Sequence, residues 1–443
     1  MTKLRPEDSL LLPPKGDRLP SLPRADGSRA DGSRAGVLRW VCTLLFVSAL
    51  VSTTVMGLRW FRLLEGLEFG AFDHLMRLRP SEKPDKRLLI VAITKQDIDQ
   101  LGNEYPISDQ TLLTTLQTLN AHQPRVIGID LYREQATGTG WTELTQYLKQ
   151  NSNQNSNQSD RIIPICVHPY GNHPESGIAP PPGLPALQTG FADATIDPDG
   201  VVRRHLLALD PPNHSPCSAS YSLSAQLVRH YLKAVGISLK FPTLNQWQFG
   251  STRFNVLESR SGFYQQPALI RGHQILLNYR MYNSLSDIAD QVSLTDVLNH
   301  QVDSALIQDR IVLIGVTDPT VKDDFSTPYG SKLRGLIFHA QMVSQLLSAV
   351  EDHRFLLRFW AFWIEIGWIW LWSVTGGVVI YWIRTPLRRV LATGVLMILL
   401  WGISLGFMVI GGVVVPLVPT LLAIVLAGGV LITLKIDPQS HPQ

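Results

Sequence analysis

Apolar residues in this chain are concentrated in four long runs, and elsewhere they alternate with polar residues. The first run covers residues 37–58, and three more lie close together at residues 359–383, 390–410 and 413–434. Each is near the ~20 residues that an α-helix needs to cross a bilayer. The pattern therefore predicts four transmembrane helices in a lipid bilayer. The alternative for the first run is a cleaved signal peptide, but no small-residue cleavage site follows it.

Residues 59–355 have the patterning of a soluble domain. Short apolar runs rich in β-branched residues predict buried strands, and runs with helical spacing predict amphipathic helices. The predicted strands are residues 88–94, 125–131, 161–167, 201–209, 274–279 and 310–315, and the predicted helices are residues 108–123, 219–235 and 336–347. Alternating strands and helices favour a mostly parallel sheet flanked by helices. We therefore predict an α/β fold, with Ser108 as a helix N-cap.

Basic residues predict the orientation of the chain in the membrane. Arginines precede the first apolar run, and residues 384–389, between the second and third runs, are strongly basic. The positive-inside rule places both regions in the cytoplasm. Residues 1–36, rich in Pro, Gly, Ser and charge, are then a disordered cytoplasmic tail, and residues 435–443 are a second cytoplasmic tail. Residues 59–355 are expected to be extracytoplasmic, and no catalytic module is expected after residue 434.

The charge balance and the cysteine content exclude two classes of protein. The net charge is +3, and no basic stripe with interleaved aromatic residues is present, so no nucleic acid is expected as a partner. Three cysteines are too few for a disulfide framework. The sequence leaves open whether Cys166 and Cys217 form a single disulfide.

Polar residues lie at or after the carboxyl ends of three predicted strands. Thr94 ends the first, Asp130 lies at the end of the second, and Asp318, Lys322 and Asp323 follow the last. The carboxyl ends of parallel strands meet at one edge of a sheet, where open α/β folds bind ligands. These residues are our candidate ligand-binding site, with a mixed charge suited to a polar or zwitterionic ligand. The alternative is structural, with Lys322 and Asp323 pairing and capping the final helix.

Two motifs in the soluble region resemble metal-binding sites, but a structural role is favoured for both. Asp197 and Asp199 suggest a calcium loop but lack its other ligands, so a turn between strands is favoured. The set of Cys166, His168 and His173 lacks a fourth zinc ligand. No metal or cofactor is predicted.

Three further motifs also have structural interpretations. Gly402 and Gly406 match a hydrolase pattern around Ser404, but within an apolar run they predict close helix packing. Residues 138–140 (GTG) predict a plain turn, because the third glycine of a dinucleotide fingerprint is absent. Glu365, in the second apolar run, is expected to snorkel or to pair with Arg358, with a proton-linked role as the alternative.

Several segments together resemble the CHASE type-two extracytoplasmic sensor family. They are residues 72–73 (FD), 77–80 (RLRP), 88–94 (LLIVAIT), 127–132 (IGIDLY), 197–204 (DPDGVVRR), 277–279 (LNY) and the stretch 309–340. The resemblance covers roughly residues 65–430. It implies a sensor domain between an anchor and three membrane segments. Family members typically pass an outside stimulus to a fused kinase or nucleotide cyclase.

The chain departs from this family in two ways. No output module is expected, and residues 105–109 (YPISD) replace a Trp-Pro-x-x-Arg-like segment. The resemblance implies a bacterial membrane sensor without enzyme activity, which binds a small molecule or an extracytoplasmic partner and signals to a separate cytoplasmic effector protein. A homodimer is left open. The alternatives are a metal-assisted hydrolase using Asp130 and Asp323, and a structural subunit of a membrane complex.

Overall fold

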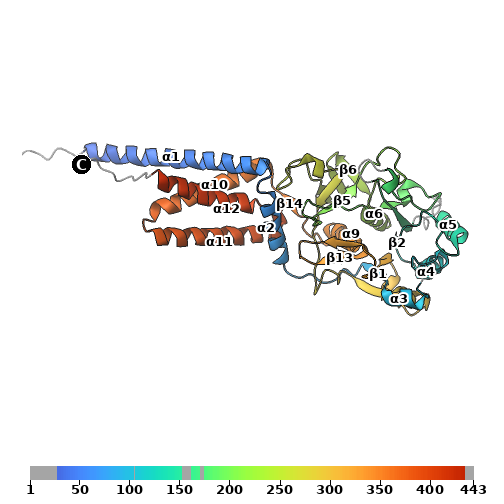
Figure 1. Ribbon diagram of the computed structural model, residues 1–443. Coiled ribbons are helices and arrows are strands. Elements are labelled where there is room, and N and C mark those ends of the chain that lie inside the picture. Colours follow the sequence, from blue (N-terminus) through green and yellow to red (C-terminus); the bar gives the residue numbers. More distant parts are fainter. Residues whose placement is uncertain (1–26, 104, 152–160, 170–173, 435–443) are drawn as a thin grey trace, which may run out of the picture.

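The computed structural model describes residues 27–103, 105–151, 161–169 and 174–434, without the side chains of residues 27–35. An α/β domain and a bundle of helices lie end to end (Figure 1). Tail residues 1–26 and 435–443, and His173, lie outside the described residues.

A six-stranded sheet forms the centre of the α/β domain. Its order is β10-β1-β11-β2-β3-β4, and every neighbouring pair is parallel. The strands are β1 (Leu88–Ile93), β2 (Val126–Asp130), β3 (Ile162–Cys166), β4 (Gly190–Phe191), β10 (Asp290–Ser293) and β11 (Ile311–Val316). The parallel α/β prediction is confirmed, since uninterrupted apolar strands suit a sheet covered on both faces.

Two predicted strands belong to a different sheet. Strands β5 (Arg204–Ala208) and β9 (His273–Leu276) pair antiparallel with each other and are not part of the central sheet. Beside them lies the antiparallel meander β6 (Leu239–Thr243), β7 (Gln246–Phe249) and β8 (Thr252–Asn255). A local apolar pattern predicts that a strand exists but does not identify the strand with which it pairs.

Helices cover both faces of the central sheet, because side chains alternate along each strand. On one face, Leu88 and Ile90 pack in a core with α6 (Leu223–Lys233) and α9 (Gly335–Glu351). On the other, Leu89 and Val91 pack in a core with other helices. These are α3 (Lys95–Gln100), α4 (Asp109–Ala121), α5 (Trp141–Gln150), α7 (Leu294–Leu298) and α8 (Ser304–Ile307).

Helix α9 is buried on every side, from Gly335 to Val350. It packs against α6 and β11 and shares its core with the β5–β9 layer. A helix that is buried all round lies inside a domain and not on its surface. The predicted helix 336–347 is therefore confirmed, and it is the central helix of the domain. Ser108 is confirmed as an N-cap, because its side chain accepts the amide of Thr111.

The four helices of the bundle run side by side (Figure 1). They are α1 (Gly27–Trp60), α10 (Phe362–Trp382), α11 (Pro386–Gly411) and α12 (Leu417–Thr433). Three are long and apolar enough to cross a membrane, namely residues 36–60 of α1, α10 and α11. Helix α1 begins within the predicted tail 1–36 and extends beyond the predicted span 37–58, since extending a helix costs less than nucleating one.

The fourth predicted span, residues 413–434, needs correction. Residues Val413–Val414 form a short strand, β15, paired with β14 (Arg358–Phe359), and the helix begins only at Leu417. Helix α12 has 17 residues. At 1.5 Å per residue it is about 25 Å long, shorter than the ~30 Å hydrocarbon core. It packs against α1 and α10, so it belongs to the bundle as a shorter apolar helix.

The predicted close packing at Gly402 and Gly406 is wrong for the described part of the chain, because a Cβ at either position would meet nothing within 4 Å. Close approach occurs instead between α10 and α12. A Cβ at Gly376 would lie 3.0 Å from the Ile424 carbonyl oxygen. Small residues allow such contacts between apolar helices.

Candidate functional site

The carboxyl ends of four neighbouring strands place polar side chains at one edge of the sheet. Strand β2 ends at Asp130, β3 is followed by His168, β4 by Asp193, and β11 by the loop containing Asp323. We call Asp130, Asp193 and Asp323 the acidic edge. Gly315 at the end of β11 allows this arrangement, because a Cβ there would lie 3.1 Å from Asp130 Cβ.

Helix α9 places His339 against the acidic edge. Its Nε2 lies 3.8 Å from Asp130 Oδ1, and the histidine and aspartate side chains are 3 % and 10 % exposed. His339 Nδ1 is buried and has no hydrogen-bond partner in the described part of the chain. A buried nitrogen without a partner costs free energy, so its presence beside carboxylates requires an explanation.

Burial controls the protonation of this pair. Loss of solvent raises the pKa of Asp130 to about 7, because the charged form is disfavoured in a buried site. Burial likewise lowers the pKa of His339 to about 4, although Asp323 and Asp193 act in the opposite direction. At neutral pH the imidazole is therefore neutral, and Asp130 exchanges its proton near physiological pH.

Asp323 lies over the first turn of α9. A Cβ on Gly335, the first residue of this helix, would collide with the Asp323 carboxylate, so glycine makes room for it. Asp323 is exposed, but partial loss of solvent and then the negative charge of Asp130 raise its pKa. Asp323 therefore lies within electrostatic range of Asp130. The helix N-terminus partly compensates this charge.

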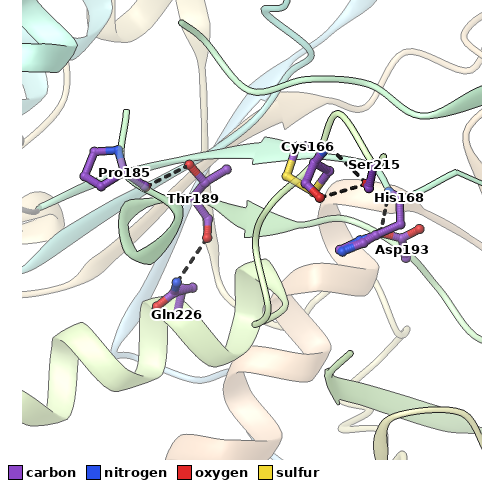
Figure 2. The surroundings of a disulfide bond; sticks show 8 residues. Cys166, His168, Pro185, Thr189, Asp193, Ser215 and Gln226 are labelled. Carbon is purple, nitrogen blue, oxygen red and sulfur yellow. Dashed lines mark hydrogen bonds and ion pairs between the residues drawn. A yellow bond between two sulfur atoms is a disulfide. The ribbon is translucent and has the colours of Figure 1, made fainter. Parts of the chain in front are cut away.

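His168 and Asp193 extend the site toward a disulfide (Figure 2). The backbone N–H of His168 donates to Asp193 Oδ2 at 3.2 Å, and its Nδ1 lies 3.9 Å from the same oxygen. Both ring nitrogens are buried without a hydrogen-bond partner in the described part of the chain. Burial lowers the pKa of His168 and raises that of Asp193. The site thus contains two neutral imidazoles with unused hydrogen-bonding capacity.

Cys166, the last residue of β3, forms a disulfide with Cys217. Figure 2 shows this bond beside His168 and Asp193. The disulfide settles the question that the sequence left open. It also removes the zinc alternative, because a disulfide sulfur is not the thiolate that zinc binds.

Two tyrosines border the acidic edge. Tyr105 and Tyr132 are 42 % and 51 % exposed. Burial raises the pKa of both hydroxyls, and the charges of Asp130 and Asp323 act in the same direction, whereas Arg133 acts against them at Tyr105. Both hydroxyls are therefore within electrostatic range of these carboxylates. Tyr105 belongs to the segment in which this chain departs from the CHASE type-two pattern.

The other candidate residues lie outside this cluster. Thr94 caps α3, where its hydroxyl and amide both bond to Asp97 Oδ2. Asp318 accepts the amide of Thr320 within its own turn at 2.8 Å, and this bond lowers its pKa. Lys322 is exposed, and no ion pair joins it to Asp323 in the part of the chain that the structure describes. Ligand binding by these three residues stays a prediction.

Local sequence patterns did not identify Asp193 or the role of His339. Asp193 follows a strand of only two residues, which carries no periodic signal. His339 lies in a helix that reads as apolar core, and only its place after the polar loop distinguishes it.

A second buried charge network links the domain to α2 (Glu65–Arg77), which lies between the domain and the bundle (Figure 1). Arg203 binds Asp73 of α2 and also Asp197 and Asp199, and Arg204 binds Asp197. The motif around Asp197 is therefore a turn, as predicted, and its carboxylates serve arginines. Residues 138–140 also form a turn, with Gly140 at φ 94° before α5.

A third network lies where α1, α2 and α10 meet. Arg59 Nη2 lies 2.9 Å from Glu68 Oε1, and Nη1 lies 2.6 Å from Glu365 Oε2. The prediction that Glu365 pairs with Arg358 is wrong. Arg358 lies in the linker before α10, where its backbone is held by β15, whereas Arg59 enters from the neighbouring helix α1.

In a comparison with known protein families, residues 47–378 match the model of the CHASE2 domain. The matched segment contains the acidic edge, both histidines and the network of Arg203. No curated protein and no solved structure matches the chain.

Proposed function

Because this chain belongs to the CHASE2 domain family, which is a family of sensory domains, we propose that it is a membrane sensor for a small cationic ligand. The observation that carries the proposal is buried His339, whose Nε2 lies 3.8 Å from Asp130 Oδ1, whose Nδ1 has no hydrogen-bond partner in the described residues, and whose pKa responds to the charges of Asp323 and Asp193. No lysine or arginine of the described residues forms an ion pair with these three carboxylates, and a site of this charge favours a positive ligand. Neutral imidazole nitrogens can accept hydrogen bonds from its N–H groups.

The aromatic rings at this site agree with a cation as ligand. Tyr105 and Tyr132 present partly exposed rings next to the carboxylates. A cation over a tyrosine face gains about 0.5–1 kcal/mol at exposed sites and more when desolvated. The proposal uses the acidic residues of this rim, and Lys322, which is exposed and makes no ion pair in the described residues, stays a predicted ligand contact.

Signal transmission would use α9. This helix begins at the acidic edge and ends at Glu351, and only residues 352–361 separate it from α10. A ligand that shifts α9 would therefore act directly on the bundle. A separate cytoplasmic effector would contact residues 384–389 or a terminal tail. Any such change requires a ligand that binds two states of the protein with different affinities.

The proposed location is a bacterial cell membrane, with the α/β domain outside. The start of α1 and the end of α12 lie at the end of the bundle remote from the domain (Figure 1), which agrees with both termini on the cytoplasmic side. The disulfide of Cys166 agrees with an oxidising compartment outside the cytoplasm.

Thermal shift on the full chain in nanodiscs tests the ligand class. The probes are putrescine and choline as cations, acetate as an anion, and Zn²⁺ and Mg²⁺ alone. We expect stabilisation by an amine that Asp323→Asn abolishes. The matched control is Asp324→Asn, which alters a neighbouring carboxylate that pairs with Arg334. This variant should bind the amine as the parent chain does. Stabilisation by acetate, or by a metal ion alone, would contradict the proposal that the ligand is an organic cation. Stabilisation by a metal ion would also favour the hydrolase alternative.

A further inference from the structure

A cleft of about 410 Å³ opens where the α/β domain meets the helix bundle. Its walls come from β8, Ile275 of β9, the end of α9, the linker to α10 and Gly411 at the end of α11. This cleft is separate from the acidic edge, because His339 lies near the start of α9 and Ala349, near its end, lines the cleft.

Basic side chains dominate the charge of this cleft. Arg253, His353 and Arg358 line it, and none of them has an ion pair in the part of the chain that the structure describes. A fourth lining residue, Arg354, is already paired with Glu82, with Nε 2.7 Å from Oε2. The lining therefore carries positive charge that no carboxylate of the cleft compensates, and such a concave surface attracts an anion.

Nearby acidic residues do not neutralise the cleft. Glu351 and Asp352, just before it in the chain, both pair with Arg87 at 2.9 and 2.8 Å. These carboxylates are thus held by another guanidinium. The unpaired arginines remain available to a ligand from outside the chain.

The position of the cleft matches the boundary of a bilayer. Helix α10 begins at Phe362 and α11 ends at Gly411, so the cleft lies at the level where the apolar helices end. Trp363, 78 % exposed, lies at this level, where tryptophan is enriched in membrane proteins. Phe355 lines the cleft and is 58 % exposed. A basic surface beside an exposed apolar one suits an amphiphilic anion.

We propose that this cleft binds the phosphate head group of an anionic phospholipid from the leaflet next to the α/β domain. Arg253 and Arg358 contact the phosphate, whose oxygens match the planar fork of a guanidinium. The acyl chains pass Phe355 into the bilayer. The lipid thereby joins β8 to the linker between α9 and α10. This inference rests on the membrane embedding proposed above and is independent of the ligand at the acidic edge.

Native mass spectrometry of the full chain from nanodiscs tests this proposal. The nanodiscs contain phosphatidylcholine with or without phosphatidylglycerol. We expect retained phosphatidylglycerol and a higher melting temperature in its presence. Arg253→Gln and Arg358→Gln should each weaken retention roughly fivefold, as one basic residue near an anionic surface contributes. Arg271→Gln, an exposed arginine outside the lining, is the control and should retain the lipid.

Two further measurements separate the remaining explanations. Arg253→Glu changes an exposed strand position and should weaken retention of phosphatidylglycerol more than Arg253→Gln does. Its melting temperature in phosphatidylcholine nanodiscs should equal that of the parent chain. Inorganic phosphate added to detergent-solubilised protein should not reproduce the stabilisation. Equal retention by Arg253→Glu and the parent chain, equal loss in Arg271→Gln, or full stabilisation by inorganic phosphate would each overturn the proposal.

Discussion

Asp73 and Arg203 form a bidentate ion pair, with Nε–Oδ1 and Nη2–Oδ2 both at 2.7 Å, across 130 positions of sequence. The pair joins α2 to the strand layer of β5. It connects two segments that resembled the sensor family separately, the Phe72–Asp73 pair and the turn after Asp197. These segments are therefore two halves of one structural feature.

Removing Asp73 should destabilise the domain strongly. Asp73→Ala leaves Arg203 buried with one carboxylate fewer, and breaking a buried ion pair costs about 3–5 kcal/mol. Chemical denaturation of the full chain in detergent measures this loss. The control is Asp99→Ala, which breaks an exposed pair with Lys95 and should cost at most about 0.5 kcal/mol. Similar losses in both variants would show that Arg203 finds other partners.

The pH dependence of stability should reveal Asp130. The pKa of Asp130 in the folded protein, about 7, lies above its value in the unfolded chain. Its contribution to the free energy of unfolding is therefore fully present below pH ~4 and is lost as the pH rises toward 7. The folded pKa of His339, about 4, lies below its unfolded value. The contribution of His339 is therefore present above pH ~6.5 and is lost as the pH falls toward 4. The two contributions oppose each other between pH ~4 and ~6.5.

Single variants should separate these opposing contributions. Asp130→Asn leaves the histidine, so relative to the parent chain its stability should fall with falling pH, by up to about 1.4 kcal/mol per unit. Relative to the parent chain, the stability of His339→Gln should instead rise with falling pH. Unfolding free energies at several pH values between 4.5 and 7 measure both slopes. Identical slopes in all three proteins would mean that neither group has the environment described above.

Loss of the disulfide should destabilise the α/β domain. Cys166 and Cys217 are 51 positions apart, and closing a loop of this length contributes about 4 kcal/mol in the chain-entropy treatment. Cys166→Ser with Cys217→Ser should therefore lower the melting temperature of the full chain. Cys42→Ser, at the free cysteine of α1, should leave it unchanged. Unchanged melting of the double variant would show that the bond is absent or without effect.

Reporter fusions test the proposed orientation in the membrane. A fusion after Pro80 should report an extracytoplasmic position, and fusions after Arg389 and Gln443 cytoplasmic ones. The last fusion is the informative one, because α12 is short for a span. An extracytoplasmic signal from Gln443 would show that α12 does not cross and would contradict the four-helix topology.

The sequence alone determined the α/β class, the bundle helices and much of the acidic edge. Buried strands such as β1 and β11 are continuous apolar runs, and helices such as α4 have both periodicity and a cap, so local patterns define them. Asp130 and Asp323 were found together because parallel strands align their carboxyl ends, a rule that needs no coordinates.

Only the tertiary structure decided which distant residues meet. Asp73 with Arg203, Arg59 with Glu365 and Cys166 with Cys217 are contacts between elements far apart in the chain. Sequence spacing carries no information about such pairs, because they depend on how layers and helices pack. The same reason explains His339: its helix is apolar core by pattern, and only the packing of α9 on β1 and β11 turns that one imidazole toward Asp130.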